Sequence, residues 1–272
     1  MPQSNFPYRH ALVTGASSGI GAALCRHLDR VGIEKITLVA RRVEMLQKLA
    51  QDLKCATSII QANLLDEADR KAVIEARGTV DLLVNNAGFG SFGPFADAPL
   101  NRQMDMITLN CQAPLHLTSN LLPQMIAERH GCIVNISSGT AFQPMPYMST
   151  YAATKSFLLH WSEGLREELQ GMGVRVIAVC PGTIDTEFAT ASDIPLHDIP
   201  AVSMVTGSMD SLTGAIISAI TKDRGVIVPG LGNFIGSMSS RFTPRFVVRK
   251  ALAFSLRPAV RLLSINKGSD SG

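Results

Sequence analysis

Short apolar runs alternate with longer amphipathic segments along this chain of 272 residues. The runs are rich in β-branched residues and are bounded by turn residues, which predicts strands. They cover residues 11–14, 35–40, 57–61, 80–84, 131–136, 174–180 and 225–228. Several are apolar without a break, as in strands that are covered on both faces. Strands that alternate with helical segments predict an α/β fold, with a parallel sheet and helical crossovers.

A glycine-rich segment follows the first run directly, and it leads into apolar residues at helical spacing. Its sequence is Thr14-Gly15-Ala16-Ser17-Ser18-Gly19-Ile20-Gly21. This order of strand, glycine turn and helix suits a phosphate-binding loop, because N–H groups at a helix N-terminus point at the anion. An ordinary strand-to-helix turn is the alternative interpretation. The candidate pyrophosphate contacts are Gly15, Ser17, Ser18, Gly19, Ile20 and Gly21.

The second run ends in two arginines, Arg41 and Arg42, and residues 35–43 contain no Asp or Glu. In dinucleotide-binding folds this position meets the adenosine ribose. An acidic residue there binds the free hydroxyl of NAD, whereas an arginine pairs with the 2′-phosphate of NADP. We therefore predict NADP(H), with Arg41 as the main partner and Arg42 as support, and NAD(H) as the alternative cofactor. Two solvated arginines at a helix start are the simpler interpretation.

A tyrosine and a lysine four residues apart, Tyr151 and Lys155, lie on one face of any helix that contains them. Reduction of a ketone needs a hydride at carbon and a proton at oxygen. A nearby ammonium lowers the pKa of a tyrosine from its usual value of about 10 and so prepares it to exchange that proton. Ser138 is placed to hold the substrate oxygen and to stabilise its developing charge. The three residues predict an oxidoreductase.

Composition narrows the class of protein further. The formal net charge is only +3, and five cysteines are scattered without a Cys-x-x-Cys pair. We expect these cysteines to be buried thiols in a reducing compartment, and we expect no metal site. The N-terminus lacks the apolar core of a signal peptide, and no stretch of about 18 or more apolar residues suggests a membrane span. A cytoplasmic location is therefore predicted.

Together the motifs resemble the short-chain dehydrogenases/reductases, in their compact single-domain branch, over residues 8–230. This resemblance implies a Rossmann-like, doubly wound three-layer sandwich, with a seven-stranded parallel sheet and three helices on each side. It also implies one dinucleotide-binding and catalytic domain, 1–272, with a substrate lid at 184–210. The motifs that carry it are Thr14 to Gly21, Asn85-Asn86-Ala87-Gly88, Asn110, Ser138, Tyr151 with Lys155, and Pro181-Gly182 followed by Thr186.

The resemblance assigns roles to single residues. It implies that Asn110 anchors a water in a proton relay from Lys155, and that Ser138 rather than Ser137 holds the substrate. Asn63 stands where most members have Asp, but its amide oxygen still accepts a hydrogen bond from an adenine amino group. The implied cofactor contacts are Asn63 and Leu64 at the adenine, Asn86, Ala87 and Gly88 under the ribose, Tyr151 and Lys155 near the nicotinamide ribose, and Pro181, Gly182, Ile184 and Thr186 at the nicotinamide.

We therefore predict an NADPH-preferring oxidoreductase that interconverts a ketone and a secondary alcohol. Apolar side chains in loops that border the site of relatives favour a lipophilic or acyl-type substrate, although side chains of this kind also fill space beneath loops. A non-enzymatic NADP(H)-binding redox sensor or scaffold is the rival class, and epimerisation or dehydration with the same cofactor is a third. The loop residues are Phe89, Phe92, Phe95, Met145 and Met148.

The resemblance also implies a homodimer or homotetramer, built on the helices that begin near Leu100 and Tyr151. The C-terminal extension, 231–272, departs from the compact pattern, because the segment from Arg224 to Lys267 has eight basic residues and no acidic one. It is interpreted as an amphipathic helix on anionic lipid, as a helix on a neighbouring subunit, or as a helix on its own domain. Nucleic acid is not expected as a partner, because no recognition motif accompanies the charge.

Overall fold

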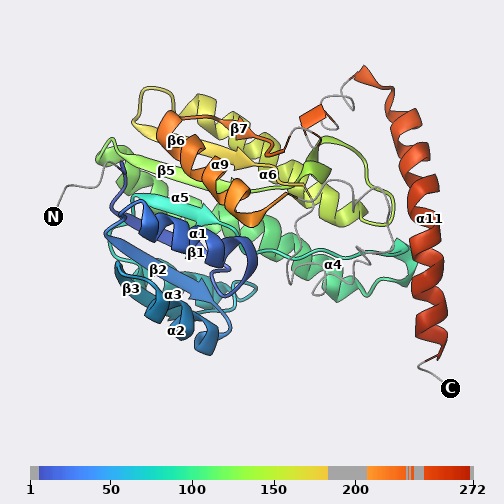
Figure 1. Cartoon of the computed structure of the whole chain (residues 1–272), viewed down its shortest axis with the longest axis horizontal. Coiled ribbons are helices and arrows are strands. Elements are labelled where there is room, and N and C mark those ends of the chain that lie inside the picture. The colour runs from blue at the N-terminus through green and yellow to red at the C-terminus, as the bar shows by residue number, and fades with distance from the viewer. Residues whose placement is uncertain (1–5, 183–206, 231, 233, 236–241, 270–272) are drawn as a thin grey trace.

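The computed structural model describes residues 6–182, 207–230, 232, 234–235 and 242–269, with the backbone alone from 261 onward (Figure 1). Within these residues, seven parallel strands form one sheet in the order β3-β2-β1-β4-β5-β6-β7. The strands are β1 His10–Thr14, β2 Lys35–Ala40, β3 Ala56–Gln61, β4 Leu82–Asn85, β5 Gly131–Ile136, β6 Val174–Val179 and β7 Val226–Ile227. The predicted fold class is confirmed, and β7 is shorter than the predicted run.

Helices cover both faces of the sheet, as predicted, and the layers are visible in Figure 1. On one face α1, α2 and α9 pack on the strands, and on the other face α3, α5 and α6 do so. Their bounds are α1 Gly19–Arg30, α2 Val43–Asp52, α3 Glu67–Ala76, α5 Ala113–Ala127, α6 Ser149–Glu168 and α9 Met209–Lys222.

Each face of the sheet has its own apolar core, because successive residues of a strand point to opposite sides. In β1, Ala11 and Val13 belong to the core under α1, while Leu12 belongs to the core under α5. All three side chains are fully buried. The unbroken apolar pattern of the strand is therefore explained by burial on both faces.

The strand order reverses beside β1, which pairs with β2 on one side and with β4 on the other. In open parallel sheets this switch point opens a crevice at the carboxyl ends of the strands, where ligands bind. The loops that follow β1, β4, β5 and β6 carry most of the predicted site residues. The topology therefore brings segments far apart in the sequence to one end of the sheet.

Two further helices lie at this end of the molecule. Helix α4, Leu100–Ile107, continues through a π-helical turn, Thr108–Gln112, into α5. Helix α11, Arg245–Ser269, comes from the C-terminal extension and stands beyond α4 (Figure 1). In the part of the chain that the structure describes, no helix is both long enough and apolar enough to cross a membrane.

Candidate active site

The glycine loop is fixed to the end of β4 by a small set of hydrogen bonds. The Thr14 hydroxyl donates to the Val84 carbonyl at 3.2 Å and accepts from the backbone N–H groups of Asn86 and Ala87, both at 3.0 Å. The Asn86 amide group donates to the carbonyl oxygens of Thr14 and Gly15, at 2.9 and 3.2 Å. Asn86 and Ala87 thus hold the first turn of the loop.

Two glycines of this loop permit contacts that any side chain would prevent. Gly15 has φ +67°, and a Cβ there would lie 2.8 Å from Asn86 Nδ2. A Cβ on Gly21 would lie 2.4 Å from the Gly15 carbonyl oxygen. Because real Cβ atoms do not approach so closely, the loop can keep this shape only with glycine at both positions.

The first turn of α1 follows the loop and has the properties of an anion cradle. Helix α1 begins at Gly19, no acidic residue occupies its first turn, and the side chain of the N-cap residue Ser18 makes no capping hydrogen bond. The free N–H groups of such a turn, together with the helix dipole, favour a phosphate group. The predicted contacts Ser17, Ser18, Gly19 and Ile20 are half-buried here, so the chain fits a dinucleotide pyrophosphate.

The two arginines after β2 differ in their surroundings. The Arg42 guanidinium donates to the Ser17 hydroxyl at 3.3 Å, which places a positive charge beside the glycine loop. Both arginine side chains are exposed, and the Arg41 carbonyl oxygen accepts from the Gln61 amide at 3.1 Å. The sequence favoured Arg41 as the main partner of a 2′-phosphate, and contact with the loop makes Arg42 a candidate of equal standing.

The predicted adenine loop follows β3, and its backbone is hydrogen-bonded to an arginine that sequence reasoning missed. Arg70 is buried and donates to the carbonyl oxygens of Leu64 at 2.7 Å and Leu65 at 3.0 Å. Asn63 is exposed, and its backbone N–H donates to the Asp69 carboxylate at 2.6 Å. Arg70 also donates to the His116 ring at 3.3 Å, and such a buried arginine on α3 has no sequence signal of its own, because its partners are brought near only by the fold.

Tyr151 lies in the first turn of α6, close to the end of β5. Its side chain is only 6 % exposed, and its hydroxyl group is hydrogen-bonded to Ser138. Burial raises the pKa of Tyr151 to about 12, and the bond to Ser138 lowers it only in part. The sequence predicted a pKa lowered by Lys155. In this arrangement burial raises the pKa instead, because it removes the phenolate from water.

Lys155 lies one turn further along α6 and is 4 % exposed. Its ammonium group donates to the Ile136 carbonyl at 2.8 Å and lies 5.8 Å from the centre of the Tyr151 ring. Burial lowers the pKa of Lys155 to about 8. The lysine therefore lies beside the tyrosine, as the four-residue spacing predicts, and is tied to the end of β5.

Asn110 is completely buried in the π-helical turn between α4 and α5. Its amide group donates to the Phe89 carbonyl and to the Thr154 hydroxyl, both at 3.0 Å, and its oxygen accepts from the Phe89 N–H at 3.2 Å. A Cβ on Gly88 would lie 2.8 Å from the Asn110 oxygen and 3.4 Å from the Lys155 ammonium. Asn110 thus ties the loop after β4 to α6, next to the lysine.

The two adjacent serines after β5 have different partners. The Ser137 hydroxyl donates to the Lys155 carbonyl at 2.7 Å, so it supports α6 from within the core. The Ser138 hydroxyl accepts from the Thr140 N–H at 3.2 Å and is hydrogen-bonded to Tyr151. The structure therefore brings Ser138, Tyr151 and Lys155 together, and it places Ser137 behind them.

A chain of buried polar groups beneath the site was missed by sequence reasoning. The Asn85 amide donates to the Asn135 side-chain oxygen at 2.8 Å, and the Asn135 amide donates to the Ser162 hydroxyl at 2.8 Å. These bonds connect β4, β5 and α6. The sequence does contain a signal for this chain of hydrogen bonds, namely two asparagines in otherwise apolar strands, because buried amides require hydrogen-bond partners.

The loop after β6 begins close to the same corner. The Pro181 carbonyl accepts from the Gly139 N–H at 2.8 Å, so Pro181 and Gly182 lie beside the segment that follows Ser138. The other two predicted nicotinamide contacts, Ile184 and Thr186, lie outside the described residues, as does most of the predicted lid at 184–210.

Apolar side chains cover the tyrosine. The cover includes side chains of α11, from the C-terminal extension, which sequence reasoning had not placed near the site. The buried members of this apolar cluster are Phe92, Met106, Met148, Tyr151, Leu256 and Ala259, and the partly buried ones are Phe89, Met145, Tyr147 and Val260. The sequence left open whether the extension packs on lipid, on another subunit or on its own domain. The inner face of α11 packs on its own domain.

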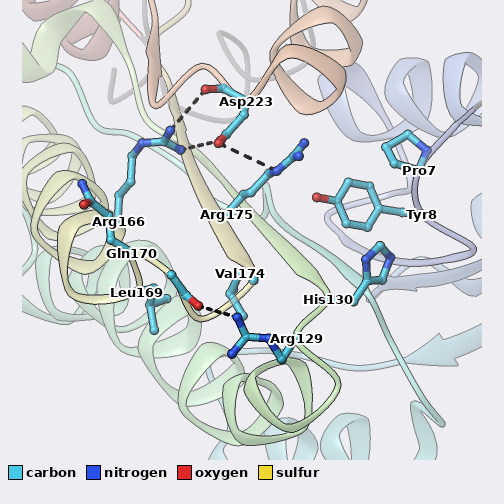
Figure 2. Close-up of a pocket in the computed structure, with 12 residues that line it drawn as sticks. Pro7, Tyr8, Arg129, His130, Arg166, Leu169, Gln170, Val174, Arg175 and Asp223 are labelled. Atoms are coloured by element: carbon cyan, nitrogen blue, oxygen red, sulfur yellow. Dashed lines mark hydrogen bonds and ion pairs between the residues drawn. The ribbon is translucent and has the colours of Figure 1, made fainter.

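A separate pocket of about 520 Å³ lies at the amino ends of the strands, far from Tyr151. Figure 2 shows Arg166 and Arg175 converging on Asp223, at 2.7 and 3.8 Å. Tyr8, which precedes β1, lines the same pocket. These ion pairs fasten the end of α6 and the start of β6 to the segment after α9, so we interpret the pocket as structural.

Comparison with known proteins is consistent with this geometry. The family model of the short chain dehydrogenases matches residues 9–195. Serine 3-dehydrogenase of Rhizobium radiobacter is 37% identical over 182 residues, which cover 65% of this chain and 72% of that protein. A short-chain dehydrogenase from Sphingobium yanoikuyae, solved in complex with NADPH, is 33% identical with a TM-score of 0.74, and the match covers 82% of this chain and 88% of that one. The bulky-bulky ketone specific alcohol dehydrogenase from Comamonas testosteroni is 30% identical with a TM-score of 0.71, over 82% and 86% of the two chains.

Proposed function

Because this chain belongs to the short-chain dehydrogenase family, we propose that it interconverts a ketone and a secondary alcohol with NADP(H). The observation that carries the proposal is the buried corner at the end of β5. There Tyr151 is hydrogen-bonded to Ser138, and the Lys155 ammonium lies 5.8 Å from the tyrosine ring. The glycine loop, which fits a dinucleotide pyrophosphate, lies at the same end of the sheet.

In the reducing direction the substrate carbon gains a hydride and the substrate oxygen gains a proton. Bound NADPH supplies the hydride. The Tyr151 hydroxyl gives the proton, and the Ser138 hydroxyl donates a hydrogen bond to the substrate oxygen as its charge develops. The Lys155 ammonium stabilises the phenolate that remains, and Asn110 holds the loop after β4 in place beside it. The apolar cover around Tyr151 excludes water from the transfer.

We propose NADP(H) rather than NAD(H) as the preferred cofactor. The positive charge of Arg42 beside Ser17 supports this choice, because a guanidinium matches the geometry of a 2′-phosphate. Two similar structures support it as well. The Sphingobium relative was solved with NADPH, and a serine dehydrogenase was solved with NADP+. Arg41 remains a second candidate for the same phosphate.

The substrate proposed is a lipophilic ketone or its alcohol. The apolar cluster over Tyr151 supports this, because the part of the substrate that lies beyond the carbonyl meets phenylalanine, methionine, leucine and alanine side chains. The Comamonas relative, which is specific for bulky ketones, agrees with such a pocket.

The test is single-turnover oxidation of NADPH with a panel of ketones. Wild-type protein is expected to oxidise NADPH and to form the matching alcohol. Tyr151→Phe is expected to lower the rate by about 100-fold or more, the usual scale for general acid–base catalysis, and still to bind NADPH. Tyr8→Phe, which removes a phenol at the other end of the sheet, is the matched control. Near-normal turnover in Tyr151→Phe removes the tyrosine from its role, and binding without turnover favours a redox sensor.

We further propose that the protein forms a homodimer or homotetramer through α4 and α6. Leu100 and Met104 on α4 and Phe157 on α6 are exposed apolar side chains, and Phe157 stacks on Trp161 with ring centres 6.0 Å apart. Burial of such a surface is a usual reason for association. In analytical ultracentrifugation the wild type is expected to sediment as an oligomer. The double variant Leu100→Arg with Phe157→Arg is expected to sediment as a smaller species, and equal masses for the two proteins would contradict the proposal.

We also propose a cytoplasmic protein whose C-terminal extension contacts anionic lipid. On α11, Phe246, Lys250, Phe254 and Arg257 recur at helical spacing, and all four side chains are exposed. An outer face that mixes aromatic and basic residues suits an anionic bilayer surface. Sedimentation with phosphatidylcholine vesicles, with and without phosphatidylserine, is expected to show binding only to the vesicles that contain phosphatidylserine. A double variant, Phe246→Ser with Phe254→Ser, is expected to lose this binding. Binding that ignores lipid charge would refute this proposal.

A further inference from the structure

Helix α11 has two chemically different faces. Val248, Leu252, Leu256 and Val260 recur every fourth residue, which places them on one side of the helix. Leu256 is 4 % exposed and its neighbour on this side, Ala259, is 1 % exposed. Among residues 245–260, these two are the buried ones. The contact between α11 and the rest of the molecule therefore centres on Leu256 and Ala259.

The partners of this face belong to the surroundings of the catalytic tyrosine. Leu256 and Ala259 share one buried cluster with Tyr151, Phe92 and Met148. Phe92 comes from the loop after β4, and Met148 immediately precedes α6. The cluster therefore joins residues of the central fold to a segment that lies more than one hundred positions later in the chain.

A substrate carbonyl that meets the Tyr151 hydroxyl must place its substituents within this cluster. Methionine side chains adapt to different shapes, because they are unbranched and polarizable. Leu256 is branched, and Ala259 is the smallest member of the cluster, so their sizes are less adjustable. The volume left for the substrate thus depends most on the two residues from α11.

We propose that Leu256 and Ala259 form one wall of the substrate pocket and set the size of the apolar substituent that the enzyme accepts. This inference rests on the proposed ketone reduction at Tyr151. It assigns the inner face of the C-terminal helix a role in substrate selection, which is separate from the lipid contact proposed for the outer face. The wall is built from a helix whose other side is exposed, as Phe254 with 78 % exposure shows.

The experiment compares three variants of the full chain with methyl ketones of increasing length, from 2-butanone to 2-decanone. Ala259→Phe fills the proposed pocket, and Leu256→Ala enlarges it. Val247→Ala, on the opposite side of the same helix from Leu256 and 42 % exposed, is the matched control. NADPH affinity, measured by fluorescence titration, verifies that each variant keeps its fold.

Ala259→Phe is expected to lower kcat/KM for 2-decanone relative to 2-butanone by about tenfold or more, since a pocket distinguishes single methylene groups by such factors. Leu256→Ala is expected to move the ratio in the opposite direction, and Val247→Ala to leave it within about twofold. A ratio unchanged in both inner-face variants, with NADPH affinity intact, overturns the inference. This remains true if one variant fails to fold, because the other changes the pocket independently.

Binding of 2-decanone to the NADP+-loaded protein, measured by calorimetry, separates this inference from the proposed reaction. A wild type that binds 2-decanone but does not reduce any ketone refutes the reaction. In that case, weaker binding by Ala259→Phe still supports the pocket wall. A wild type that does not bind 2-decanone, or binding that Ala259→Phe leaves unchanged, overturns the wall.

Discussion

Lys155 allows a prediction about stability that is independent of any substrate. Its ammonium group is almost wholly buried, and burial lowers its pKa from the ordinary value of 10.5 to about 8. Between pH 8 and 10.5 the folded chain has released a proton that the unfolded chain still binds. Stability rises with pH wherever the unfolded state binds more protons. The lysine therefore lowers stability most below pH 8, and this cost is relieved as the pH rises.

The size of the effect follows from the two pKa values. The difference between 10.5 and about 8 corresponds to about 3 kcal/mol in the free energy of unfolding, since each pKa unit is worth about 1.4 kcal/mol. Lys155→Met removes the titrating group and leaves the other ionisable residues in place. The free energy of unfolding of the wild type, minus that of Lys155→Met, is therefore expected to rise by about 2 to 3 kcal/mol between pH 7 and pH 10.

Urea denaturation at several pH values, followed by the fluorescence of the one tryptophan, Trp161, measures this difference. Lys71→Met is a control for the loss of a lysine charge, because the Lys71 ammonium pairs with Glu67 at the surface, at 2.7 Å. Lost packing and the lost hydrogen bond to Ile136 add a constant to this difference, so they cancel when the difference is compared between pH values. A difference that stays constant within about 0.5 kcal/mol would refute the argument that the lysine is charged at a cost.

Four further substitutions test the nucleotide loop and its support. Arg41→Asp and Arg42→Asp are expected to lower the preference for NADPH over NADH, measured as a ratio of kcat/KM, by about tenfold or more, and unchanged ratios in both would exclude a bound 2′-phosphate there. Gly21→Ala is expected to weaken NADPH binding by at least about tenfold in a fluorescence titration, because its Cβ would lie 2.4 Å from the Gly15 carbonyl oxygen; wild-type affinity would contradict this. Asn110→Ala is expected to lower the free energy of unfolding in urea by about 2 to 3 kcal/mol, because three buried hydrogen bonds are lost, and a change below about 1 kcal/mol would show that their partners find replacements.

Local patterns were sufficient to predict most of the framework. The strands were found because their apolar runs are short and bounded, and the pairing of Tyr151 with Lys155 follows from helical spacing alone. The choice of Ser138 over Ser137 came from the family resemblance, and the hydrogen bonds of the two hydroxyl groups agree with it. Strand ends were less accurate, as β7 shows, because the last pairing depends on the neighbouring strand rather than on the run itself.

Properties that depend on distant packing could not be predicted in this way. The direction of the Tyr151 pKa follows from how deeply the ring is buried, and part of its cover comes from residues about one hundred positions away. The position of α11 could not be derived from its sequence, although the four-residue repeat of its apolar residues was visible. Arg70 and the paired amides of Asn85 and Asn135 serve backbone or side-chain partners that only the folded topology brings near.

The π-helical turn at Thr108–Gln112 has a consequence for how the chain tolerates deletions. A π-helical turn holds one residue more than the α-helical turn that it replaces, so removal of one residue within it would close the turn to regular α-helix and leave α4 and α5 in nearly the same relative orientation. The wider turn that presents Asn110 to Phe89 and Thr154 would be lost, and with it the anchor of the loop after β4. Deletion of one residue at this point would therefore disturb the site while the two helices keep their packing.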